Sequence, residues 1–144
     1  MHRRPVSRGR ILATLSAIVV AVGCILPWYT VGGELAAIPA RSVNAFDGLS
    51  GLLVFLSALA VLALVALPYA AGDQPIAIDR WPSYLLLLLA GTVCLGLSVL
   101  SIVTGAFLAE GFRPDRAPGL WVAVVGLTGL ARATFEIARE PERH

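Results

Sequence analysis

Arg132 and Glu136 are the charged residues whose spacing most plainly allows chemistry. They lie four positions apart, so on a helix their side chains share one face and can form an ion pair. One hypothesis gives the pair a role as a gate or as a contact with a partner subunit. The alternative, which we favour, is that Arg132 extends to a polar boundary while Glu136 lies in water, as long charged side chains commonly do. The choice depends on what surrounds this helix.

Seven further charged residues gather in two short polar segments, 30–47 and 110–116. Mixed charge in such segments is typical of ordinary solvated loops. If the two segments meet in space, their side chains instead form a polar cap that could bind a ligand or a partner protein. The candidate residues of this polar cap are Glu34, Arg41, Asp47, Glu110, Arg113, Asp115 and Arg116.

The residue types that usually carry catalysis or bind metals are sparse. The histidines, His2 and His144, stand at opposite ends of the chain, and the cysteines, Cys24 and Cys94, have no CxxC spacing. No acid, base and nucleophile are grouped in a way that indicates an active site. We therefore expect no catalytic activity, no metal and no cofactor. Residues 21–24 partly resemble the lipidation motif of bacterial lipoproteins, so a lipid on Cys24 stays open as an alternative.

The composition indicates that hydrocarbon, not water, surrounds much of this chain. Apolar residues make up 58% of its 144 residues and charged residues 14%, with a mean hydropathy of +0.83. A soluble domain has about 45–50% apolar and about 25% charged residues. A chain this short has no interior large enough to hide the excess. The basic residues are all Arg and are not clustered on one face, and the net charge is only +2, so we expect no nucleic-acid partner.

Four apolar runs predict four membrane-spanning helices. They cover about residues 11–29, 48–70, 81–109 and 117–138. A helix needs ~20 residues to cross a bilayer, and the runs lack the apolar–polar alternation of a membrane β-barrel. Asn44, with Asp47 three positions on, resembles a capping box before the second run. The predicted fold is an all-α membrane protein, a single antiparallel up-down bundle of four transmembrane helices.

The distribution of Arg predicts the orientation of this bundle. Antiparallel helices place segments 30–47 and 110–116 on one side of the membrane, and segment 71–80 with both termini on the other. The first side holds three Arg residues, which are Arg41, Arg113 and Arg116. The second side holds eight, which are Arg3, Arg4, Arg8, Arg10, Arg80, Arg132, Arg139 and Arg143. Because cytoplasmic loops are rich in Arg and Lys, we expect a multi-pass protein of the cell membrane with both termini in the cytoplasm.

Small residues recur every four positions within the apolar runs. The rows are Ala13, Ala17 and Ala21; Ala90, Cys94 and Ser98; Ser101, Gly105 and Ala109; and Gly119 and Ala123, followed by Gly126 and Gly129. This spacing lets helix backbones approach closely, which drives helix association in lipid. The rows serve either a tight bundle or docking to other subunits. The interiors of the first three runs contain no ionisable side chain apart from cysteine, so proton-coupled transport is not indicated.

Two short motifs mark the ends of the first connection. Leu26-Pro27-Trp28 closes the first apolar run and Asp47-Gly48 opens the second. With these motifs and its four runs, the chain resembles the small four-span membrane proteins of unknown function that are common in GC-rich bacteria. The resemblance covers the layout of the whole chain and implies four transmembrane helices, but it assigns no functional residue.

The expected function follows from two observations. The chain has surfaces suited to helix packing, and it has no group of residues that indicates catalysis. We expect a non-enzymatic integral membrane protein in contact with the lipid bilayer. Its expected role is that of a structural or accessory subunit of a membrane complex or of a homo-oligomer. The alternative is a small channel or transporter for an unidentified solute.

Overall fold

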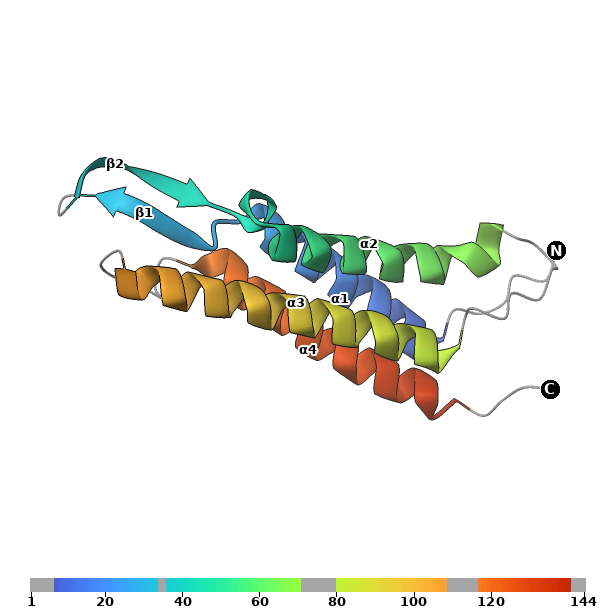
Figure 1. The fold of residues 1–144 in the computed structure, drawn as a ribbon. Coiled ribbons are helices and arrows are strands. Elements are labelled where there is room, and N and C mark those ends of the chain that lie inside the picture. Colours follow the sequence, from blue (N-terminus) through green and yellow to red (C-terminus); the bar gives the residue numbers. More distant parts are fainter. Residues whose placement is uncertain (1–6, 34–35, 71–79, 109–116, 141–144) are drawn as a thin grey trace.

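The computed structural model describes residues 7–33, 36–70, 80–108 and 117–140 of the chain. Most of these residues lie in four long helices, and consecutive helices run antiparallel (Figure 1). The elements are α1 (Arg8–Ile25), β1 (Tyr29–Gly33), β2 (Ala36–Val43), the short 3-10 helix η1 (Ala45–Asp47), α2 (Leu49–Ala70), α3 (Trp81–Leu108) and α4 (Pro118–Ala138). The predicted all-α bundle of four helices is confirmed.

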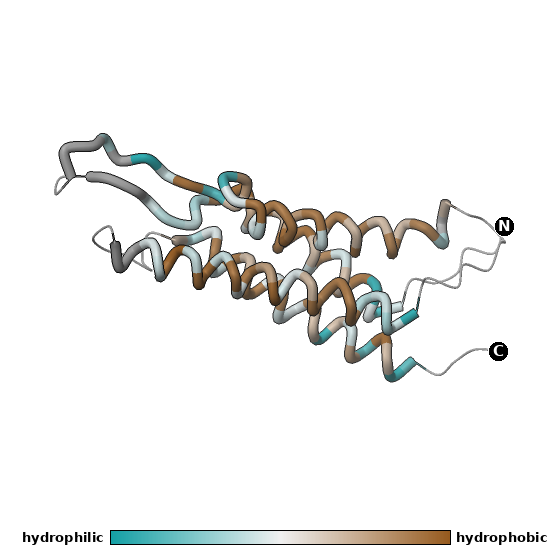
Figure 2. The backbone as a smooth tube through the Cα atoms, viewed as in Figure 1, coloured by the Kyte–Doolittle hydropathy of each residue, from teal (hydrophilic) through white to brown (hydrophobic). Residues whose placement is uncertain are grey.

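All four helices are long and apolar enough to cross a membrane. They contain 18, 22, 28 and 21 residues. At about 1.5 Å per residue their lengths are about 27–42 Å, against a hydrocarbon core of ~30 Å. Figure 2 shows apolar residues along the middle of the helices, and hydrophilic residues in β2 and at the ends of α1 and α4 near the chain termini. The chain is therefore a multi-pass membrane protein.

The bounds of α1 follow from its end residues and differ from the predicted run 11–29. Ser7 accepts a hydrogen bond from the backbone N–H of Arg10 at 3.4 Å, so the helix already begins in the basic segment before the apolar run. At the other end, Pro27 favours an extended conformation of the residue before it, and Leu26 has φ −70° and ψ 156°. The helix therefore stops at Ile25.

The connection between α1 and α2 contains a β-hairpin, where the sequence suggested only a loop. β1 and β2 pair antiparallel, with Tyr29 opposite Val43 and Gly33 opposite Ala36. The hairpin lies at the end of the bundle away from the termini (Figure 1). An isolated two-stranded hairpin is only marginally stable, so it needs an anchor on the rest of the protein. Tyr29 provides one, because it packs partly buried against the core.

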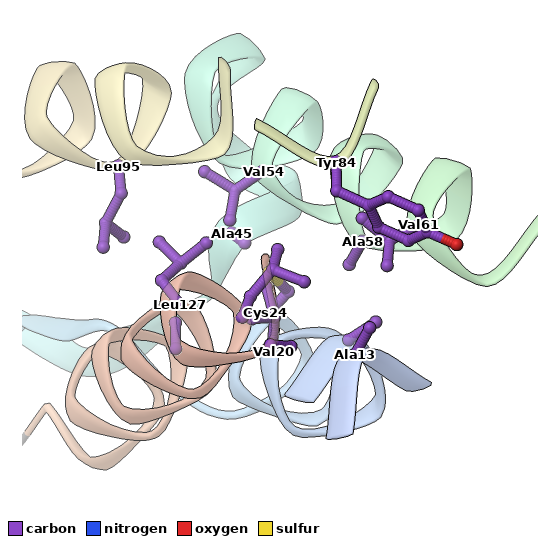
Figure 3. Close-up of a cluster of buried hydrophobic side chains, with 14 of the residues drawn as sticks. Ala13, Val20, Cys24, Ala45, Val54, Ala58, Val61, Tyr84, Leu95 and Leu127 are labelled. Carbon is purple, nitrogen blue, oxygen red and sulfur yellow. The ribbon is translucent and has the colours of Figure 1, made fainter. Parts of the chain in front are cut away.

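The helices pack as a ring in which the contacts differ greatly in extent. α1 has its largest contact with α4, and α2 packs between α1 and α3, while the contact of α3 with α4 is the smallest of the four. The centre is filled mainly by small and β-branched side chains (Figure 3). Those drawn include Ala13, Val20, Cys24, Ala45, Val54, Ala58, Val61, Tyr84, Leu95 and Leu127. α1 and α4 thus form the most extensively packed pair of the fold, and α3 lies at its edge.

Candidate functional site

The Leu26-Pro27-Trp28 motif ties three elements together at one point. Because Pro27 has no N–H, the carbonyl of Gly23, four residues earlier, cannot receive its usual helical hydrogen bond. The buried indole of Trp28 donates to this carbonyl instead, at 2.9 Å. The backbone N–H of Trp28 donates to Val43 at 2.8 Å, and the carbonyl of Pro27 accepts from Gly119 at 3.0 Å. The motif therefore joins the end of α1 to the hairpin and to the start of α4.

The second motif, around Asp47-Gly48, is a capping structure. Asp47 accepts a hydrogen bond from the backbone N–H of Asn44 at 3.0 Å, and Asn44 accepts one from Phe46 at 3.1 Å. The predicted capping box is confirmed, although it caps η1 and α2 begins only two residues later. Gly51 then lies so close to the backbone of Ala45 that no side chain fits between them. Both motifs of the sequence resemblance are thus explained by local structure.

Arg132 and Glu136 lie on one face of α4, as their spacing predicted, and they form an ion pair. Arg132 Nε lies 3.1 Å from Glu136 Oε1, with the two side chains 67% and 32% exposed. Exposed pairs of this type contribute only about 0.3–0.5 kcal/mol. On the next turn, the guanidinium of Arg139 lies 4.0 Å from the centre of the exposed Phe135 ring. The pair lies on the outer surface of α4 and does not line a space between the helices.

Arg10 and Glu140 form a second ion pair that sequence reasoning missed. Their side chains approach to 3.5 Å and link the first turn of α1 to the residues that follow α4. The residues are 130 positions apart in the sequence, so only the packing of α1 on α4 could have revealed the contact. It holds together the end of the bundle where α1 begins and α4 ends.

The predicted polar cap is described only in part. Arg41 and Asp47 lie 3.6 Å apart, and the Arg41 side chain is largely exposed. Five of the seven candidates, which are Glu34, Glu110, Arg113, Asp115 and Arg116, fall outside the described residues. The described part of the predicted cap is thus one weak ion pair next to the capping box, and whether the two segments meet stays a prediction.

A small pocket of about 60 Å³, lined in part by Asp47, lies between the base of the hairpin, the start of α2 and the facing part of α3. Its polar lining includes Asn44, Asp47, Ser50, Ser98 and Ser101. The Ser98 and Ser50 hydroxyls lie 2.8 Å apart, and Ser98 also lies 2.9 Å from the carbonyl of Cys94. This contact between α2 and α3 was not predicted, because the sequence does not give the register of the two helices. Ser57 and Thr134, by contrast, donate to their own helix backbones.

Both cysteines are free thiols. Cys24 is completely buried on the inner face of α1. Its lipidation stays an open alternative, since a lipidated Cys24 would require removal of the residues before it. Among the described residues, no group of His, Cys, Asp and Glu side chains could hold a metal ion. The remaining candidates for a functional site are therefore exposed surfaces of the helices and contacts between helices.

α1 and α4 approach each other closely along a seam. It consists of Gly9, Ser16, Val20 and Gly23 of α1 and of Gly119, Ala123, Gly126, Gly129, Ala133 and Ile137 of α4. A Cβ added to Gly23 would lie 2.6 Å from the backbone nitrogen of Ala123, and one added to Gly126 would lie 2.7 Å from that of Val20. These approaches leave no room for a larger side chain. The small-residue row of α4 is therefore used within the chain. In the row of α1, Ala13 and Ala17 are buried in the core and Ala21 is partly buried.

The rows of α3 are mostly not used in this way. Ala90, Ser101 and Gly105 are exposed, and of the described row members only Ser98 is fully buried. A Cβ added to Gly96 or Gly105 would meet nothing within 4 Å. The large exposed side chains Leu86, Leu89, Val93, Leu97 and Leu100 complete an outer face of α3 that no other described part of the chain covers.

No family model, curated protein or solved structure matches this chain. The assignment of a function therefore rests on the geometry of the chain itself.

Proposed function

We propose that this protein is a non-enzymatic structural or accessory subunit of the membrane, and that it binds a second copy of itself through the outer face of α3. The observation that carries the proposal is the uneven burial of the four helices. Only 17% of the residues in the apolar part of α3 are buried, against 39–44% in α1, α2 and α4. α3 is therefore the helix with the most surface left for an outside contact.

The exposed glycines of α3 support this assignment. A glycine in a helix costs about 0.5–1 kcal/mol relative to alanine. In the seam, and at Gly91 beside Ser57, the glycines allow close approach of another helix. Gly96 lies between the large side chains of the outer face and has no such neighbour among the residues that the structure describes. A second helix packed over Gly96 would supply the contact that Gly91 and the seam glycines obtain internally, since close packing and not the hydrophobic effect joins helices in lipid.

The mass of the full chain in a mild detergent tests the proposal. We expect at least two copies per particle by native mass spectrometry. Gly96→Leu should shift the particles to single chains, because the new side chain keeps the second helix away. Ala131→Leu makes a similar change at an exposed position of α4 and should leave the particles intact. A wild-type protein that runs as a single chain without any partner would contradict the proposal.

We also propose that the bundle lies in the cell membrane with both termini in the cytoplasm. Five Arg residues of the described ranges belong to the end of the bundle where α1 begins and α4 ends, namely Arg8, Arg10, Arg80, Arg132 and Arg139, and only Arg41 belongs to the other end. This asymmetry favours the first end for the cytoplasm. A reporter that becomes fluorescent only in the cytoplasm, fused to His144, should be fluorescent. A fusion that inserts stably into the membrane without fluorescence would show the opposite orientation.

The channel or transporter alternative has one observation in its favour, the hydroxyl-lined pocket around Ser50 and Ser98. In the described residues, however, every fully buried side-chain nitrogen or oxygen already has a hydrogen-bond partner. Such groups offer little to a passing ion. Reconstitution into liposomes with ion and solute flux assays separates the two functions, because a subunit of the proposed kind leaves the liposomes tight.

A further inference from the structure

A groove opens between α2 and α3 at the end of the bundle where α1 begins. It has a volume of about 520 Å³ and lies open on one side. It is lined by Ala60, Ala63, Leu64 and Leu67 of α2 and by Pro82, Ser83, Leu86 and Leu87 of α3. Binding sites for small molecules have volumes of about 300–1,000 Å³. Ser83 carries the single polar side chain of this lining, so the groove suits a hydrocarbon chain.

The two helices are held on the other side of the groove and at its far end. Tyr84 is fully buried and lies beside Ala58 and Val61 of α2 (Figure 3). Further along, a Cβ on Gly91 would lie 2.8 Å from Ser57 Oγ, so α2 and α3 are in close contact there. Between these contacts and the helix ends, the small side chains of Ala60 and Ala63 leave space beside α3. The groove is therefore built by the packing of the two helices.

The residues that precede the groove lining have the chemistry of a lipid headgroup site. Arg80 and Trp81 are exposed and come directly before Pro82 and Ser83 in the chain. A guanidinium forms paired hydrogen bonds with a phosphate, and tryptophan prefers the level of the headgroups. Asp79 directly precedes Arg80 in the sequence, so this segment has no excess of positive charge. Recognition would therefore depend on direct binding of a phosphate and not on general attraction to an anionic membrane.

From these observations we propose that the groove between α2 and α3 binds one phospholipid. One acyl chain lies in the groove along Ala60, Ala63 and Leu64, and the phosphate is bound by Arg80 at the level of Trp81. The groove opens toward the side of the bundle, where the bilayer supplies such a chain at the same depth. The lipid would occupy a fixed position beside the outer face of α3, with which the groove shares Leu86.

Native mass spectrometry of the full chain in a mild detergent tests the site. With added dioleoyl phosphatidylcholine we expect one retained lipid per chain. Dioleoylglycerol has the same acyl chains but no phosphate, and it should be retained far less. Arg80→Gln should weaken retention of the phospholipid about tenfold, because a hydrogen bond to a charged group is lost. Equal retention of the two lipids, or no retained lipid, would overturn the proposal.

Two matched variants locate the bound lipid. Ala63→Leu fills the groove and should abolish retention, whereas Ala66→Leu adds the same side chain at an exposed position of α2 outside the lining and should not. Unchanged helical circular dichroism will show that both variants fold. If the two variants retain lipid equally, the groove is not the site. If Ala63→Leu instead changes the number of copies per particle and leaves the lipid bound, the groove holds a second chain and the proposal fails.

Discussion

The α1–α4 pair and α3 use the same kind of residue in opposite ways. Along the seam, glycines and alanines bring two backbones so close that no Cβ could be added at Gly23 or Gly126. On α3, Gly96 has open space around it, although it lies in a helix that is more apolar than α1 and α4. A row of small residues therefore shows that another helix can pack closely against it. It does not show whether that helix belongs to the same chain or to another one. The internal or external use of a row depends on which faces the other helices cover.

The same difference divides the molecule into two parts. The α1–α4 pair provides most of the stability of the fold, and α3 provides most of its uncovered surface. The seam is strengthened at one end by the hydrogen bond between Pro27 and Gly119 and at the other by the Arg10–Glu140 ion pair. α3 has a limited contact with α2 and a smaller one with α4. Substitutions of the same type should therefore have large effects in the first part and small effects in the second.

The largest difference is expected between two tryptophans. Trp28→Ala should lower the free energy of unfolding by about 3–5 kcal/mol, because it removes a buried ring and the donor to Gly23 at the Pro27 break. Trp81→Ala removes a ring that is 46% exposed at the start of α3 and should cost less than about 1 kcal/mol. Unfolding by increasing sodium dodecyl sulfate in mixed micelles, followed by circular dichroism, measures both. Similar losses for the two variants would refute the division into a stable and a peripheral part.

The next difference compares two glycines. Gly126→Leu places a side chain against the backbone of α1 at Val20 and should cost about 3 kcal/mol or prevent folding. Gly96→Leu, made on the open face of α3, should change the unfolding of single chains by no more than about 0.5 kcal/mol. The same micelle titration applies, at a protein concentration low enough to keep the chains separate. A strongly destabilised Gly96→Leu chain would mean that another part of the chain covers this face.

Much of the fold could be predicted because it depends on local properties. Apolar length sets the four helices, and the capping box of Asn44 and Asp47 is a contact over three residues. The hydrogen bond from Trp28 to Gly23 was also within reach, since a proline always leaves the carbonyl four residues earlier without its donor. The hairpin had a signal too, because the β-prone Tyr29-Thr30-Val31 precedes Gly32-Gly33, but the segment was interpreted as a loop.

The rest depends on how helices distant in sequence are aligned. Arg10–Glu140 and Ser50–Ser98 join residues 130 and 48 positions apart. The sequence does not show which residues form these pairs, because a shift of one helix by a single turn would bring other side chains together. The same holds for the candidate site. The sequence identified Arg132 and Glu136 from their spacing, but it could not show that α3 would be the least covered helix.

The smallest expected effect tests a side-chain hydrogen bond that joins α2 to α3, between Ser98 and Ser50. Ser98→Ala removes the contact with Ser50 and should cost about 0.6 kcal/mol, the average for hydrogen bonds between helices in a membrane protein. Thr92→Val is the matched change on the exposed side of α3, where the hydroxyl donates only to Leu88 of its own helix, and it should have almost no effect. A double-mutant cycle with Ser50→Ala isolates the pair. A coupling energy near zero would mean that the two hydroxyls do not hold α3 in place, and α3 would then depend on apolar packing and on its outside contacts alone.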